Sequence, residues 1–161
     1  MKKKIICISV IVIIVFVFSI FGRGIYFYGK YMVPDKSYFG NQYNEILHPM
    51  SVQDKKQATE IMKMIDEAFS FIGKDTDAKN KFKALSRYCV SEAYCAVSEE
   101  HSLKLITADF DETKGYLWFV YDQEAFTGSG KKAMGSWDIL VRATLEKSDK
   151  GWTVVDTKEH P

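Results

Sequence analysis

The feature that most constrains this chain is a long apolar segment close to its N-terminus. Residues 5–21 carry no charged side chain, and only one cysteine and two serines interrupt the aliphatic and aromatic residues. As an α-helix the run rises about 25 Å, close to the hydrocarbon thickness of about 30 Å, and apolar residues resume just beyond it. It has no polar face, which excludes an ordinary core-packed helix. We therefore expect a transmembrane anchor over residues 5–28.

The charges before this segment predict its orientation. Lys2, Lys3 and Lys4 precede the apolar run, and the positive-inside rule places such a cluster in the cytoplasm. Residues 1–4 would form a cytoplasmic tail, and the remainder of a single-pass cell-membrane protein would lie outside.

A cleaved signal peptide starts in the same way and remains the alternative. Its cleavage site needs small residues at alternating positions after the apolar run, and only Gly22-Arg23-Gly24 has that shape here. The arginine between the glycines fits such a site poorly, so the pattern favours an uncleaved anchor. Both interpretations place the folded domain outside the cytoplasm.

Beyond the anchor about 130 residues remain, enough for one domain with one core. Five of the 22 basic residues lie within the first 30, so the other 17 face 21 acidic residues and leave a net charge of −4. A negatively charged domain repels polyanions, so we expect neither nucleic acid nor an anionic lipid surface as its partner.

Helical periodicity appears first after residue 51. Ser51 and Asp54 have the spacing of a capping box, and Gly73 suits a helix C-terminus. Apolar residues then recur at intervals of three and four, at Ala58, Ile61, Ile65, Ala68 and Ile72. This pattern predicts a helix over residues 52–72 with one buried face.

The remainder of the chain predicts a short helix and then strands. Asp75, Thr76 and Asp77 offer an N-cap for a helix over residues 78–90, whereas residues 91–100 fit either helix or strand. Alternating apolar residues and turn signals then predict four antiparallel strands, over residues 102–111, 115–126, 137–146 and 152–158.

Helices that precede antiparallel strands indicate an α+β domain. We expect two helices packed on a curved four-stranded antiparallel sheet, as a domain over residues 51–161. The segment 29–50 is punctuated by prolines and glycine and reads as an irregular linker from the membrane.

The C-terminal hairpin resembles a known family. A long strand over residues 137–147, a polar turn at 148–151 and the Gly151-Trp152 pair lead into a short valine-rich strand. This ending resembles small exported bacterial members of the nuclear transport factor 2-like superfamily, also called cystatin-like. The resemblance spans residues 52–158 and implies a long helix wrapped by a curved sheet, with a homodimer or an envelope protein partner. The superfamily includes enzymes, receptors and scaffolds, so it implies no particular reaction.

The resemblance also implies a pocket between helix and sheet, where enzymes of the superfamily place acids, histidines or tyrosines. Simple alternation puts Asp156 on one strand face with Trp152 and Val154, so this acid either points inward or is an ordinary polar residue near the end of the strand. Burial would raise the pKa of this carboxyl and suit a general base. Asp122 is a weaker candidate. The tryptophans are either core or pocket lining, and the candidate pocket residues are Trp118, Trp137, Arg142, Trp152 and Asp156.

Cys89 and Cys95 would share an oxidising compartment. A continuous helix would separate them by about 9 Å of rise, whereas a disulfide needs Cα atoms within about 7 Å. A bridge therefore requires a turn within residues 91–94, and two buried thiols are the alternative.

The histidines are His48, His101 and His160, and none has a second ligand at a spacing typical of metal sites. We therefore expect neither a metal nor a cofactor.

Together these features favour a membrane-anchored extracytoplasmic binding or scaffold domain in a bacterial envelope over an enzyme. One alternative is an assembly subunit of a type IV secretion or conjugation machine, which shares the short tail, single span and similar outer domain. The other is a small hydrolase or isomerase. A buried acid facing a pocket would favour the enzyme, and a filled core would favour the binding module.

Overall fold

The computed structural model describes residues 13, 15, 22–32 and 35–160. The chain divides into two compact units, Met1–Pro49 and Met50–Pro161. The predicted transmembrane segment, residues 5–28, lies largely outside the described residues. Within the described part of the chain, no helix is both long and apolar enough to cross a bilayer.

The first unit is helical where the structure describes it. Residues 22–30 form a helix, and α2 (Asp35–Phe39) is followed directly by the 3-10 helix η1 (Gly40–Leu47). Gly40 adopts a positive φ of 61°, which allows the chain to turn between these two elements. The expectation of an irregular linker over residues 29–50 was therefore wrong.

Aromatic packing explains why this segment is ordered. The rings of Tyr28 and Tyr43 lie 4.9 Å apart, and the Tyr43 hydroxyl donates a hydrogen bond of 2.6 Å to the backbone carbonyl of Tyr28. Phe27 and Tyr31 stack with their ring centroids 6.1 Å apart. Aromatic residues that the sequence assigned to the end of the anchor and to the linker thus pack together in this unit.

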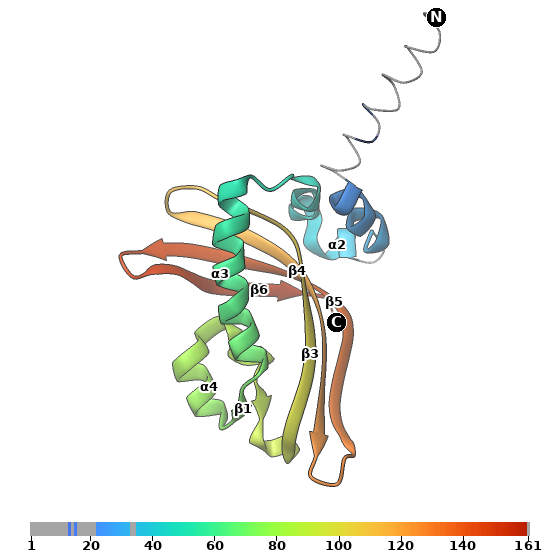
Figure 1. Ribbon diagram of the computed structural model, residues 1–161, viewed down its shortest axis with the longest axis vertical. Coiled ribbons are helices and arrows are strands. Elements are labelled where there is room, and N and C mark those ends of the chain that lie inside the picture. The colour runs from blue at the N-terminus through green and yellow to red at the C-terminus, as the bar shows by residue number, and fades with distance from the viewer. Residues whose placement is uncertain (1–12, 14, 16–21, 33–34, 161) are drawn as a thin grey trace, which may run out of the picture. The chain divides into compact units, whose positions relative to one another are not determined.

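The second unit is an α+β domain, as predicted (Figure 1). Its helices are α3 (Val52–Phe69), α4 (Asp75–Phe82) and the 3-10 helices η2 (Lys83–Tyr88) and η3 (Glu92–Tyr94). A four-stranded antiparallel meander follows, made of β3 (Ala96–Phe110), β4 (Lys114–Thr127), β5 (Lys132–Ser148) and β6 (Gly151–Glu159). A parallel pair, β1 (Ile72–Gly73) and β2 (Val90–Ser91), was not predicted.

Helix α3 begins at the predicted capping box. The Ser51 hydroxyl oxygen accepts a 3.0 Å hydrogen bond from the backbone N–H of Asp54, and the Asp54 carboxylate accepts one of 3.1 Å from the backbone N–H of Ser51. Both bonds satisfy donors that a helix start leaves unpaired. The helix ends at Phe69 rather than residue 72, because Ile72 pairs with Val90 in the small parallel sheet.

The second helix differs from its prediction at both ends. It begins at Asp75 after Lys74, whose side chain makes no capping hydrogen bond, and Asp75 and Asp77 instead lie in the first turn, where acidic groups are favourable. The α-helix stops at Phe82. Lys83 then adopts a positive φ of 51°, and the chain continues as η2.

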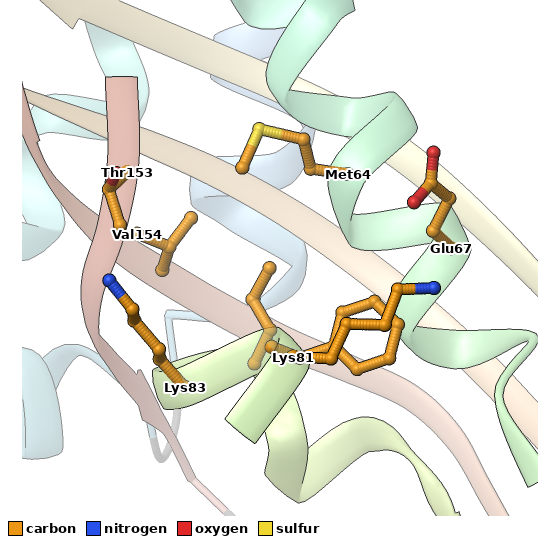
Figure 2. Close-up of a pocket in the computed structure, with 8 residues that line it drawn as sticks. Met64, Glu67, Lys81, Lys83, Thr153 and Val154 are labelled. Carbon is orange, nitrogen blue, oxygen red and sulfur yellow. The ribbon is translucent and has the colours of Figure 1, made fainter. Parts of the chain in front are cut away.

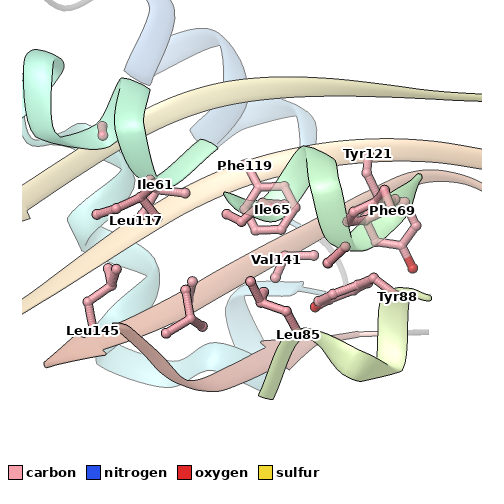
Figure 3. Packing of buried hydrophobic residues seen from close by; sticks show 14 of the residues in the cluster. Ile61, Ile65, Phe69, Leu85, Tyr88, Leu117, Phe119, Tyr121, Val141 and Leu145 are labelled. Atoms are coloured by element: carbon pink, nitrogen blue, oxygen red, sulfur yellow. The ribbon is translucent and has the colours of Figure 1, made fainter. Parts of the chain in front are cut away.

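The core lies between α3 and one face of the sheet, called here the helix-covered face. Figure 1 shows α3 lying across long, bent strands, and Figure 3 shows Ile65 and Phe69 of the helix packed among side chains of β4 and β5. Ile65, Phe119 and Val141 are fully buried. The apolar face of the helix and the apolar face of the sheet therefore pack against each other in one continuous core.

An extra residue in β5 interrupts the predicted alternation. Tyr121 pairs with Ile139, whereas Gln123 pairs with Ser136, so β5 uses three steps where β4 uses two. Asp138 has a φ of 58°, typical of a β-bulge, and its backbone N–H donates a 2.7 Å hydrogen bond to the Asp122 carboxylate. Because of this extra residue, the residues of β5 that precede the bulge lie on the face of the sheet opposite to the one that simple alternation predicts.

We expect Ile65→Ala to lower the free energy of unfolding of the second unit by about 2–5 kcal/mol, because it removes a fully buried side chain from the centre of the core. The measurement is urea denaturation followed by tryptophan fluorescence. Val52→Ala is the matched control on the same helix. Val52 is 90% exposed, so its truncation should change the free energy by less than about 0.5 kcal/mol.

Candidate functional site

The three tryptophans occupy three different environments. Trp118 is fully buried, but it lies between Leu117 and Phe119 of the helix-covered face and therefore belongs to the opposite face of β4. Trp137 is 54% exposed, because the bulge in β5 moves it off the helix-covered face. Trp152 is half-buried at the margin of the core, with its ring 5.0 Å from that of Phe110. They do not line one pocket.

Asp156 points away from the helix, contrary to the prediction. The register pairs Leu145 with Val154 but Thr144 with Asp156, so Val155 is an extra residue in β6. This bulge breaks the alternation on which the prediction depended. As a result Thr157 takes the buried position and Asp156 is exposed, which removes it as an inward-facing general base.

Arg142 also lies on the face opposite α3. It neighbours Val141 and Ala143, which both belong to the core, and strand alternation turns it the other way. Its Nη1 donates a 2.9 Å hydrogen bond to Thr144 Oγ1, and its guanidinium lies 5.3 Å from the centre of the Tyr116 ring. The residues predicted as a ligand pocket therefore do not converge on one cavity.

A surface cavity of about 240 Å³ opens elsewhere, at the margin of the helix-covered face. Figure 2 shows Met64 and Glu67 of α3 on one side, Lys81 and Lys83 below, and β6 opposite. The wall is mainly apolar and the rim is charged. The lining residues are Met64, Glu67, Lys81, Phe82, Lys83, Leu85, Thr153 and Val154. We take this cavity as the candidate functional site.

The ends of α4 and η2 position the two lysines of this cavity. Lys81 lies in the last turn of α4, with its Nζ 4.7 Å from the centre of the Phe82 ring. Lys83 follows at the junction, where its backbone N–H donates to the Lys79 carbonyl while its φ is 51° and its ψ is −117°. Sequence reasoning missed this site because no motif marks a cavity formed by three separate elements.

A second arrangement that the sequence did not reveal lies at the end of β6. Arg87 Nη2 donates a 2.7 Å hydrogen bond to Glu159 Oε1, and the Tyr121 hydroxyl donates one of 3.4 Å to Glu159 Oε2. Burial, followed by the charge of Glu159, raises the pKa of Tyr121 to about 12, so the hydroxyl stays protonated and acts as a donor. Arg87 and Glu159 are separated by 72 positions in the sequence, so no local sequence pattern predicts their contact.

His101 joins α3 to β3 through two carboxylates. Its Nε2 lies 2.9 Å from Asp66 Oδ1, its Nδ1 lies 3.0 Å from Glu99 Oε2, and its ring lies 5.4 Å from that of Phe69. Burial by itself lowers the pKa of His101, but the hydrogen bonds to the two carboxylates raise it more, so the net shift is upward. The sequence showed this histidine only as an isolated residue at the start of a strand.

The structure does not join Cys89 to Cys95, and both thiols are free. The chain does turn between them, through η3. Cys89 is half-buried, and burial raises the pKa of its thiol to about 11. Cys95 is exposed, with a left-handed φ of 53°.

In the part of the chain that the structure describes, no group of three or more histidine, cysteine, aspartate or glutamate side chains is arranged to hold a metal ion. No protein-family model and no curated protein matches the sequence.

We expect the free energy of unfolding to fall as the pH rises from about 6 to about 8.5. His101 has a raised pKa in the folded state, so its stabilisation is complete below the unfolded value of about 6.5 and is lost as pH rises through the folded value. Urea denaturation at both pH values measures this difference. His101→Gln should reduce it, whereas His48→Gln should preserve it. An unchanged pH dependence in His101→Gln would contradict the assignment.

We expect Cys95 to react with iodoacetamide at least about tenfold faster than Cys89 near pH 8, because only the thiolate is nucleophilic and burial keeps Cys89 protonated. Peptide mass spectrometry after timed alkylation measures both rates in a Cys7→Ser background. Equal rates, or a peptide in which Cys89 and Cys95 are linked, would show that the free-thiol arrangement is wrong.

Proposed function

We propose that this protein is a membrane-anchored binding or scaffold domain that works outside the cytoplasm of a bacterium and belongs to the nuclear transport factor 2-like superfamily. The observation that carries the proposal is the filled interior between α3 and the sheet. Ile65 and Phe69 of the helix and Phe119 and Val141 of the sheet are all fully buried there.

A filled interior favours binding over catalysis for a physical reason. General acid–base chemistry needs a positioned group with a tuned pKa and space for a substrate beside it. Here aliphatic and aromatic side chains occupy that space, and Asp156 is exposed on the opposite face of the sheet. Binding is then left to the outer surface of the domain, including the cavity formed by α3, η2 and β6.

One contact supports the alternative of a small pocket enzyme. Glu159 accepts a hydrogen bond from Tyr121, a pairing of acid and phenol that could transfer a proton. Glu159 is also paired with Arg87, and neither Tyr121 nor Glu159 lines the cavity described above. The contact therefore supports a structural role more strongly than a catalytic one.

The proposal places the cell membrane at the N-terminus. The lysines at positions 2–4 and the apolar run that follows support an anchor whose N-terminus lies in the cytoplasm. The domain beyond it carries a net negative charge, which suits a protein partner or a second copy of the chain better than an anionic lipid surface.

We expect protease added to intact spheroplasts to digest the domain, while the membrane fraction keeps an N-terminal fragment, because the anchor is uncleaved and the domain lies outside. Immunoblotting with antibodies against each end measures both products. A cytoplasmic marker protein that survives the treatment shows that the membrane stayed closed. Complete protection of the domain, or a mature N-terminus near residue 25, would overturn the proposed topology.

A further inference from the structure

The cavity formed by α3, η2 and β6 combines an apolar wall with cations at its rim. Met64, Phe82 and Val154 supply the wall, and Met64 is still 39% exposed. Exposed apolar surface in a concave site is unfavourable in water and favours a ligand with an apolar body. The wall therefore indicates that part of the ligand is apolar.

The charges at the rim indicate the charge of the ligand. Lys81 and Lys83 contribute two positive charges, and Glu67 contributes one negative charge, so the rim carries a net charge of +1. Within the described residues Lys83 makes no ion pair. An ammonium group without a carboxylate partner, next to apolar surface, attracts an anion. The net charge matches a ligand with a single negative charge.

The backbone at Lys83 supports the same conclusion. Its φ of 51° and ψ of −117° lie outside the regions that residues with a Cβ normally adopt. Strained residues of this kind persist where the surroundings hold them, and they are often found at ligand-binding positions. Figure 2 shows that the strained junction lets Lys83 extend along β6 beside Val154, at the rim of the cavity.

We propose that this cavity binds a small carboxylate with an apolar chain, with the chain against Met64, Phe82 and Val154 and the carboxylate at Lys83, whose ammonium group lies beside β6 in Figure 2. The inference rests on the proposed binding function and names its ligand class. A cavity of about 240 Å³ is suited to a small ligand, and hexanoate is the probe chosen for this class.

The test titrates hexanoate into the full-length chain in detergent micelles with ¹³C-methyl-labelled methionine. Met64 lines the cavity, and its methyl resonance is assigned by its loss in Met64→Leu. The other five methionines report on any nonspecific effect of the probe. We expect a saturable shift of the Met64 resonance, with little change at Met62 on the same helix. Equal shifts at all methionines would show nonspecific partition and would overturn the proposal.

Hexylammonium is the matched probe of opposite charge. It has the same number of carbon atoms and an apolar chain longer by one methylene, so weaker binding can only reflect the charge. We expect it to bind at least about tenfold more weakly if Lys83 recognises the carboxylate. Equal or tighter binding of hexylammonium would assign the cavity to cations through Glu67 and would overturn the proposal.

Two variants test the lysines separately. Lys83→Gln should weaken hexanoate binding by about tenfold. Lys81→Gln should weaken it less, because the Lys81 ammonium group lies on the opposite side of the cavity, below Glu67 (Figure 2). The unchanged Met62 resonance verifies that each variant is folded. Lys131→Gln removes an exposed lysine in the loop between β4 and β5, and binding should stay unchanged. A loss in Lys131→Gln equal to that in Lys83→Gln would refute the site. The protease experiment tests the topology without any ligand. A failure of hexanoate to bind would therefore overturn the ligand class and leave the proposed function unchanged.

Discussion

The packing of α3 against the sheet is the contact on which the rest of the domain depends. Ile61, Ile65 and Phe69 form the helical stripe that the strands of β4 and β5 cover, and this burial supplies the main stabilisation of a domain of this size. The capping box at Ser51 fixes where the stripe begins. The helix fills the interior, and the candidate cavity opens at its margin, where α3, the junction of α4 and η2, and β6 meet.

Polar contacts at the margins hold this packing in register. His101 ties α3 to β3 through Asp66, and Gln123 donates hydrogen bonds to the backbone carbonyls of Phe69 and Tyr88, at 3.3 and 2.9 Å. These bonds satisfy backbone carbonyl groups at the ends of two helices, Phe69 in α3 and Tyr88 in η2. At the other side, Arg87 and Glu159 fasten η2 to the end of β6, so the segment that carries Lys81 and Lys83 is held against the sheet.

Among the register shifts of the sheet, two β-bulges determine where the predicted site residues point. The bulge at Asp138 moves Trp137 out of the core, and the bulge at Val155 exchanges Asp156 for Thr157. Each adds one residue to a strand whose side chains alternate with a period of two, so a single insertion reverses the faces on one side of it. The second of these bulges places Asp156 on the face of the sheet opposite α3.

The sequence by itself determined the helix over α3, its cap at Ser51, the order of the four strands and the α+β class, because each depends on periodicity and turn chemistry within a few residues. Only the tertiary structure decided that residues 35–47 are helical, that Asp156 faces outward, and that Lys81 and Lys83 meet β6 at a cavity. These features depend on bulges and on contacts between residues far apart in the chain, such as Arg87 with Glu159. No local pattern encodes them, because their energies arise only when separate elements pack together.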